Sequence, residues 1–287
     1  MAFSHVIGTV WAATLEEELE KALVYASPRC VNRKYEGQLR GVGDTVRIPM
    51  LSSPTVIDYT RNTDLAAPEA LNDASTTLVV DQAKAVHFAI DDIDRATSPY
   101  DLIEVSSRSA AYKLADAADQ HVAGKMAANV AAGNRVGSQS QPININTSPT
   151  NSSYLTLVQL AGELDEANVP RSGRWVVVSP LFLTRLLIHQ NCVFTAAQQS
   201  QAALANGLVG PIAGFDVIVS NNVPIRDNVH RIIAGVSDAT SFVALIQATE
   251  VYRPERRFGQ AVKSLYLYGC KVVRPEMLAM AFVSFSN

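Results

Sequence analysis

Residues 35–90 restrict the possible folds of this chain more than any other segment. Residues 44–48 alternate polar and apolar side chains as a strand does, and residues 76–90 predict a second, longer strand. The polar residues 52–75 separate them, so the pattern predicts an open hairpin with a long irregular tip. Such a connection is unusual inside one compact domain. We expect it to reach a partner, most simply another copy of the chain; a mobile surface loop is the alternative.

The composition limits the class of protein. Of the 287 residues, 48% are hydrophobic and 18% are charged, which suits a chain whose surface is largely covered by neighbours. The net charge of −3 lacks the basic excess of a tight nucleic-acid binder, so sequence-specific DNA binding is not expected. Cys30, Cys192 and Cys270 form no C-x-x-C pair and indicate reduced thiols rather than a zinc site or a disulfide framework.

The sequence predicts neither a signal peptide nor a membrane-spanning segment. Residues 1–10 carry no basic start and no long apolar core, and no run of about 18 apolar residues occurs in the chain. We therefore expect no signal peptide, no contact with a membrane, and synthesis and folding in a cytoplasm.

Helical patterns lie on both sides of the hairpin. Residues 11–26 predict a first helix with a capping box at Thr14 and Glu17, and its leucine stripe faces either the core or a neighbouring subunit. Residues 99–131 form a longer, Ala-rich pattern; at about 1.5 Å per residue it would be a rod of about 48 Å, suited to a mechanical spine. The acidic residues 91–94 between strand and helix suit the positive end of a helix dipole better than a calcium loop.

Residues 151–249 mix helical and strand patterns and predict a small α/β or α+β unit. We expect a helix at 154–168, a buried strand at 174–178 followed by a helix from Pro180, and a helical region at 181–206. From residue 250 the pattern is strand-like again, and the apolar strand at 277–283 should be buried in a sheet.

The sequence carries none of the usual catalytic signatures. It contains no G-x-S-x-G, no H-E-x-x-H and no Gly-Lys-Ser/Thr, and its five histidines do not cluster along the chain. We expect a structural protein rather than an enzyme, with no catalytic residues, no cofactor and no metal site.

Several short segments occur in a fixed order along nearly the whole chain. They are Trp11, residues 35–37, 43–46, 80–82, 90–94, 114–116, 175–180, 214–217 and 220–224, then 268–269 and 274–275. In this order and spacing they resemble the major capsid proteins of tailed bacteriophages, which share the Hong Kong 97-type fold.

The resemblance implies an α+β architecture with five parts. These are an N-terminal arm with a helix (1–34), an extended β-hairpin loop (35–90), a peripheral domain with the spine helix (91–150), an axial α/β domain (151–249) and return strands of the peripheral domain (250–287).

The resemblance also implies a function and partners. Hundreds of copies would assemble as pentamers and hexamers into the icosahedral shell of a virion, after synthesis in the bacterial host cytoplasm. The shell would enclose double-stranded DNA with non-specific contacts, and a portal and optionally a decoration protein would join it. Because little sequence precedes the arm, we expect a separate scaffolding protein.

Charged side chains on the arm and near residue 255 predict contacts between subunits. The set comprises Asp58, Arg61, Asp64 and Glu69 on the arm, and Arg253, Glu255, Arg256 and Arg257 further along. The arginines could pair with the acids of a neighbour's arm; a solvated surface run is the alternative. No lysine lies between Lys34 and Lys84, so the Lys–Asn crosslink of some members of that family is not expected.

Two other functions remain open at this point. An encapsulin-like nanocompartment shell of the same fold would enclose an enzyme rather than DNA. A soluble α/β enzyme would be a small closed particle with a defined pocket, with residues 52–75 ordered as a lid.

Overall fold

The computed structural model describes residues 23–36, 43–51, 56, 58–59, 61–62, 64, 73–97, 102–146, 151–188, 211–256 and 258–285. The predicted helix at 11–26 lies outside this set except for residues 23–26, which form turns and not a helix. Of the region predicted to be helical at 181–206, only the part up to residue 188 is described. No helix within the described ranges is long and apolar enough to cross a membrane.

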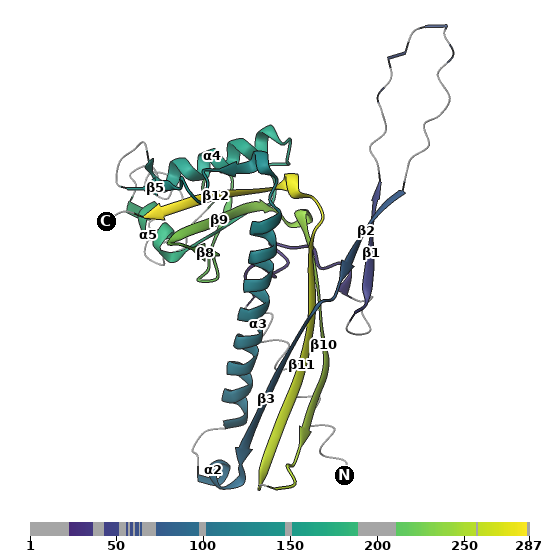
Figure 1. Cartoon of the computed structure of the whole chain (residues 1–287), viewed down its shortest axis with the longest axis vertical. Coiled ribbons are helices and arrows are strands. Elements are labelled where there is room, and N and C mark those ends of the chain that lie inside the picture. Colours follow the sequence, from purple (N-terminus) through teal and green to yellow (C-terminus); the bar gives the residue numbers. More distant parts are fainter. Residues whose placement is uncertain are drawn as a thin grey trace.

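The lower body of the molecule is a long helix laid along a three-stranded antiparallel sheet (Figure 1). The sheet order is β10 (Thr240–Tyr252), β11 (Gly259–Val272) and β3 (Gln82–Asp91). Helix α3 (Leu102–Asn129) follows the short α2 (Asp92–Thr97). Its 28 residues correspond to about 42 Å at about 1.5 Å per residue, so the predicted spine-like rod is present.

One stripe of α3 accounts for its position against the rest of the chain. Ala111, Leu114, Ala118, Val122 and Met126 recur at helical spacing and are all buried. Six buried residues of α3 are alanines, so the helix backbone can approach its neighbours closely: Ala110, Ala111, Ala115, Ala118, Ala123 and Ala127.

The upper body is a second sheet with two helices (Figure 1). Its strand order is β4-β12-β9-β6-β7, with β5 paired to β12 and β8 paired to β9. The bounds are β4 (Arg135–Val136), β5 (Ile143–Ile145), α4 (Ser153–Glu166), β6 (Arg174–Val178), α5 (Pro180–Ile188), β7 (Asp216–Val219), β8 (Ile225–Arg226), β9 (Val229–Val236) and β12 (Leu278–Phe285). Short 3-10 turns occur at Ala132–Asn134, Ser237–Ala239 and Pro275–Met277.

The membership of the two sheets differs from the predicted division of the chain. Strand β12 was expected among return strands beside the spine helix, but it lies inside the second sheet, antiparallel to β9. Strand β10 was split by the predicted boundary at 249 and belongs wholly to the three-stranded sheet. The apolar pattern of a strand reports that it is buried and not which sheet buries it, so these assignments required the tertiary structure.

The predicted strand at 76–90 is two strands. Strand β2 (Asp73–Val79) pairs with β1 (Thr45–Leu51) in a two-stranded antiparallel hairpin, whereas β3 pairs with β11. The chain changes sheets at Val80 and Asp81, where the apolar run 78–80 is followed by the polar pair 81–82. From this point the hairpin projects away from both sheets (Figure 1).

Candidate assembly surfaces

The hairpin is attached to the body by a small hydrophobic cluster of its own. Val46 and Ile48 of β1 and Leu78 of β2 turn the same face inward and are buried with Val80. They pack on Val243 and Leu267 of the three-stranded sheet. This root cluster is separate from the main core, so the hairpin has a fixed base and a projecting end.

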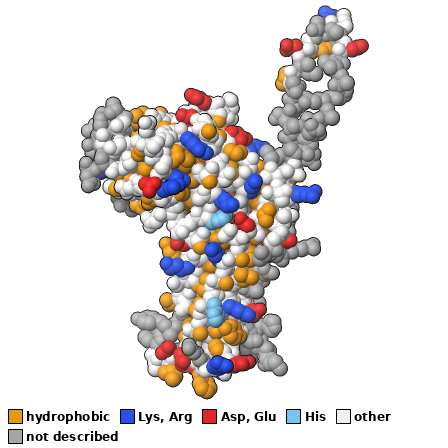
Figure 2. All heavy atoms as spheres, in the orientation of Figure 1, with side chains coloured by type: hydrophobic (Ala, Val, Ile, Leu, Met, Phe, Trp, Pro, Cys, Tyr) orange, Lys and Arg blue, Asp and Glu red, His pale blue; other side chains and the backbone are white. Residues whose placement is uncertain are grey.

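The far end of the hairpin exposes apolar and charged side chains together. Val56 is 94% exposed and Tyr59 is 68% exposed. Asp58, Arg61 and Asp64, three of the predicted contact residues, are exposed beside them, and Figure 2 shows charges of both signs at this tip. Apolar side chains displayed so far from a core are typical of a surface that contacts another molecule.

The turn between β10 and β11 lies at the opposite end of the molecule from the hairpin (Figure 1). It exposes Arg253, Glu255 and Arg256. Arg253 donates a hydrogen bond of 3.0 Å to Asp92 at the start of α2, so it already has a partner in its own subunit. Of the predicted contact residues, Glu69 and Arg257 lie outside the described part of the chain.

The two predicted charged groups therefore do not meet within one subunit. Tip and turn lie at opposite ends of an elongated chain, so a pairing between them could form only between copies. The turn also adjoins exposed apolar side chains, with Phe258 at 84% and Ile93 at 71% exposure. Each end thus combines apolar surface with charge, as protein–protein contact surfaces do.

The acidic residues at 91–94 have structural partners. Asp91 accepts a hydrogen bond of 2.9 Å from the Ile93 amide, and Asp92 pairs with Arg253. Asp92 and Asp94 lie in the first turn of α2, where negative charge is favoured. Among the described residues, no group of three His, Cys, Asp or Glu side chains is placed to hold a metal ion.

The two described cysteines are buried and carry free thiols. Burial raises the pKa of both the Cys30 and the Cys270 thiol to about 12. The reactive thiolate is therefore scarce at neutral pH, and the free thiols agree with the prediction of reduced cysteines.

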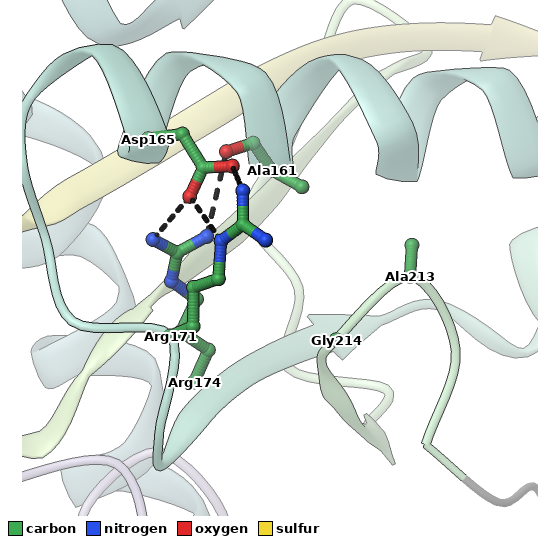
Figure 3. Close-up of a pocket in the computed structure, with 6 residues that line it drawn as sticks. All are labelled: Ala161, Asp165, Arg171, Arg174, Ala213 and Gly214. Atoms are coloured by element: carbon green, nitrogen blue, oxygen red, sulfur yellow. Dashed lines mark hydrogen bonds and ion pairs between the residues drawn. The ribbon is translucent and has the colours of Figure 1, made fainter.

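A pocket of about 260 Å³ lies beside α4, and its polar groups already bind one another (Figure 3). Arg174 is buried and donates to the Asp165 carboxylate at 2.7 Å and to the Pro170 carbonyl at 2.9 Å. Arg171 donates to the same carboxylate at 2.7 Å. Hydrogen bonds from Arg171 and Arg174 hold the pKa of the Asp165 carboxyl below its ordinary value.

This arrangement braces the connection between α4 and β6. The Arg174 guanidinium also binds the carbonyls of Ala161 and Val169, so its donors point to its own chain and not into the pocket. The geometry supports a structural role for the cluster.

Sequence reasoning missed two features that organise these surfaces. One is the root cluster of the hairpin, which joins residues from four separate parts of the chain. The other is Asp119, a buried acid within the apolar stripe of α3. The sequence does show this residue as one carboxylate at a position where the helical spacing of α3 predicts an apolar side chain.

The sequence and the fold both resemble known proteins. Residues 73–281 match the family model described as phage capsid protein. No curated protein sequence matches the chain. A structure titled Mycobacterium phage Che8 is 27% identical, covers 92% of this chain and 91% of its own, and superimposes with a TM-score of 0.67.

Two further structures share the fold at lower identity. The capsid of cyanophage P-SCSP1u is 19% identical over 86% of this chain and 85% of its own, with a TM-score of 0.67. An encapsulin complex from Synechococcus elongatus is 12% identical over 85% of this chain and 83% of its own, with a TM-score of 0.52.

Proposed function

This chain belongs to the phage capsid protein family, and we propose that copies of it assemble as pentamers and hexamers into the icosahedral head of a tailed bacteriophage. It is a major capsid protein with the Hong Kong 97-type fold. The head would enclose the double-stranded DNA genome. The protein would be made in the host cytoplasm and function in the virion.

The observation that carries this proposal is the separation of the two contact surfaces. A hairpin held by its own root cluster displays Val56 and Tyr59 far from the body, and the β10–β11 turn displays Phe258 at the opposite end. Neither surface can cover the other within one chain. A lattice of copies would cover both, and many modest contacts would add up over a closed shell.

The fold supports a revised assignment of domains. The seven-stranded sheet with α4 and α5 would be the axial domain, and α3 with the three-stranded sheet would be the peripheral domain. The axial domain would then include β4, β5 and β12, and the peripheral domain would include all of β10. Residues 35–79 would form the extended loop that reaches over an adjacent subunit, and residues 1–34 the N-terminal arm.

The proposed partners follow from a structural and not a catalytic role. Copies of the chain would be the main partner, and a separate scaffolding protein would direct their assembly. A portal would occupy part of the shell, with a decoration protein on its surface as an optional addition. Contacts with packaged DNA would be non-specific, as the net charge of −3 suggests.

An encapsulin-like compartment is the second candidate, because an encapsulin complex shares the fold. The two functions differ in what the shell holds. Nuclease-resistant DNA inside particles isolated from infected cells would support the phage head. A single co-purifying enzyme without DNA would support the compartment.

The primary test is negative-stain microscopy of the purified full chain, with light scattering on the same sample. Closed shells, capsomers or curved sheets are expected. A 30.9 kDa monomer that persists with crowding agents and with a candidate scaffolding protein would contradict the proposal and favour an enzyme.

A further inference from the structure

Asp119 is a buried acid in the middle of the apolar stripe of α3. It is 1% exposed and lies between Ala118 and Val122, which are both fully buried. A carboxylate removed from water is costly unless hydrogen bonds compensate it. The compensation here comes from a segment almost a hundred residues earlier in the chain.

Backbone amides of the N-terminal segment surround this carboxylate. The Val24 amide donates to Oδ2 at 2.7 Å, and the Ala26 amide donates to Oδ1 at 3.0 Å. Each oxygen of the carboxylate therefore accepts a backbone hydrogen bond from the same segment.

The same segment is packed into the main core and joined to the three-stranded sheet. Tyr25, Ala26 and Cys30 are fully buried. Asn32 then donates to the Thr240 carbonyl at 2.8 Å and accepts from the Phe242 amide at 3.0 Å. Residues 23–32 therefore lie between the spine helix and β10, and the chain runs from them towards the hairpin.

We propose that Asp119 is the positioning residue that docks residues 23–31 against α3 and so sets where the N-terminal arm and the hairpin leave the body. The contact lies in the interior of a single subunit, away from the exposed ends. Its effect on assembly rests on the proposed capsid function; its effect on docking does not.

The docking is linked to protonation. Burial, the largest cause, raises the pKa of the Asp119 carboxyl to about 6 although the backbone hydrogen bonds lower it. The titratable groups that face it are Asp116 on the same helix, Tyr25 and Cys30 on the segment, and Tyr266 on β11.

The sign of this linkage follows from the two states of the carboxyl. In the undocked chain the carboxyl has its ordinary pKa, so the docked state binds the proton more tightly. Protonation of Asp119 therefore contributes its full stabilisation of docking at pH values below the ordinary pKa of an aspartate. This stabilisation is lost as the pH rises through about 6, the pKa of Asp119 in the docked state. Between pH 7 and pH 5 this corresponds to roughly a tenfold gain in the docking constant.

Hydrogen exchange of the Val24 and Ala26 amides in the full chain tests the docking. In the native chain both should be protected, with protection rising roughly tenfold from pH 7 to pH 5 after correction for intrinsic exchange. Asp119→Ala should remove most of that protection. Asp119→Asn should keep part of it, because one oxygen remains an acceptor, and should lose its pH dependence.

Controls separate docking from general unfolding. Asp116→Ala, one turn away and bonded to Gln120, should leave the Val24 and Ala26 amides protected, although loss of the Asp116 charge lowers the pKa of Asp119 and so shifts the pH dependence. The Ala234 amide in the centre of β9 should stay protected in every variant. Equal protection of Val24 and Ala26 in native chain and Asp119→Asn at both pH values would overturn the proposal; this variant keeps the side-chain volume if Asp119→Ala fails to fold.

Assembly is the second readout, and its outcomes are distinct. We expect Asp119→Ala and Asp119→Asn to yield fewer closed shells than the native chain under conditions where the native chain assembles. Unaltered shells from variants that have lost amide protection would overturn the positioning role alone. A native chain that forms no assemblies even with crowding agents and a candidate scaffolding protein would contradict the proposed capsid function, and the exchange result would still decide the docking.

Discussion

Gly269 of β11 lies directly against the backbone of Val79, where the hairpin leaves the body. A Cβ on Gly269 would contact the Val79 carbonyl oxygen and come within 3.0 Å of the Val80 Cα. Both obstacles are backbone atoms, which cannot move aside as a flexible side chain can. The chain crosses from β2 to β3 at this point, so the absence of a side chain at 269 sets how closely the hairpin seats on the sheet.

Gly269→Ala is therefore expected to displace the root of the hairpin. The substitution should lower the free energy of unfolding by about 1–3 kcal/mol, as at other overpacked sites. The yield of shells should also fall, because the hairpin would leave the body in a different direction and its tip would no longer meet its contact on a neighbour. Chemical denaturation and light scattering measure the two effects. Gly124→Ala is the matched control: Gly124 has open space around it on α3, so this change should be neutral or slightly stabilising. Identical behaviour of the two variants would contradict the close-approach argument.

Arg174 should matter far more for stability than its neighbour Arg171. Arg174→Ala leaves the buried carbonyl of Val169 without its donor, and a buried group left unpaired typically costs about 1–3 kcal/mol. Arg171 is 82% exposed and its replacement by Ala should change stability little. Urea denaturation of both variants gives the comparison, and equal midpoints would show that the buried brace contributes nothing.

Charge at the β10–β11 turn should act on assembly and not on the fold. Replacing Arg256 and Arg257 together by glutamine is expected to lower the yield of shells, because exposed pairs worth at most about 1 kcal/mol each are repeated over the lattice. Circular dichroism should be unchanged. Replacement by lysine keeps the charge and should restore most of the yield. The pairing idea fails if the glutamine variant assembles as well as the native chain.

Mature shells should contain no covalent ladder of subunits. The hairpin has no lysine to form an isopeptide bond with an asparagine of a neighbour, since none lies between Lys34 and Lys84. Denaturing gels of mature particles should show one band at the mass of the single chain. Bands at multiples of that mass, resistant to reductant, would refute this expectation.

Several elements were predictable because their signal is local. The stripe of α3 repeats at helical spacing over about four turns, and the apolar run of β6 followed by Pro180 marks a strand and a helix start. The two strands of the hairpin were predicted for the same reason, although residues 76–90 proved to be two strands. Periodicity shows which face of a strand is covered and not which strand it pairs with, so it could not reveal the change of partner after Val79.

The sequence by itself determined the secondary structure of the spine helix and the buried strands, the long polar tip and the resemblance to the capsid family. These features depend on the periodicity of nearby residues and on the order of short motifs, which can both be read along the chain. Only the tertiary structure decided that β12 lies beside β9, that Gly269 meets Val79 and that Asp119 holds the amides of Val24 and Ala26. These three are contacts between residues far apart in the chain. Their energies depend on which surfaces fold against each other, and no local pattern records that choice.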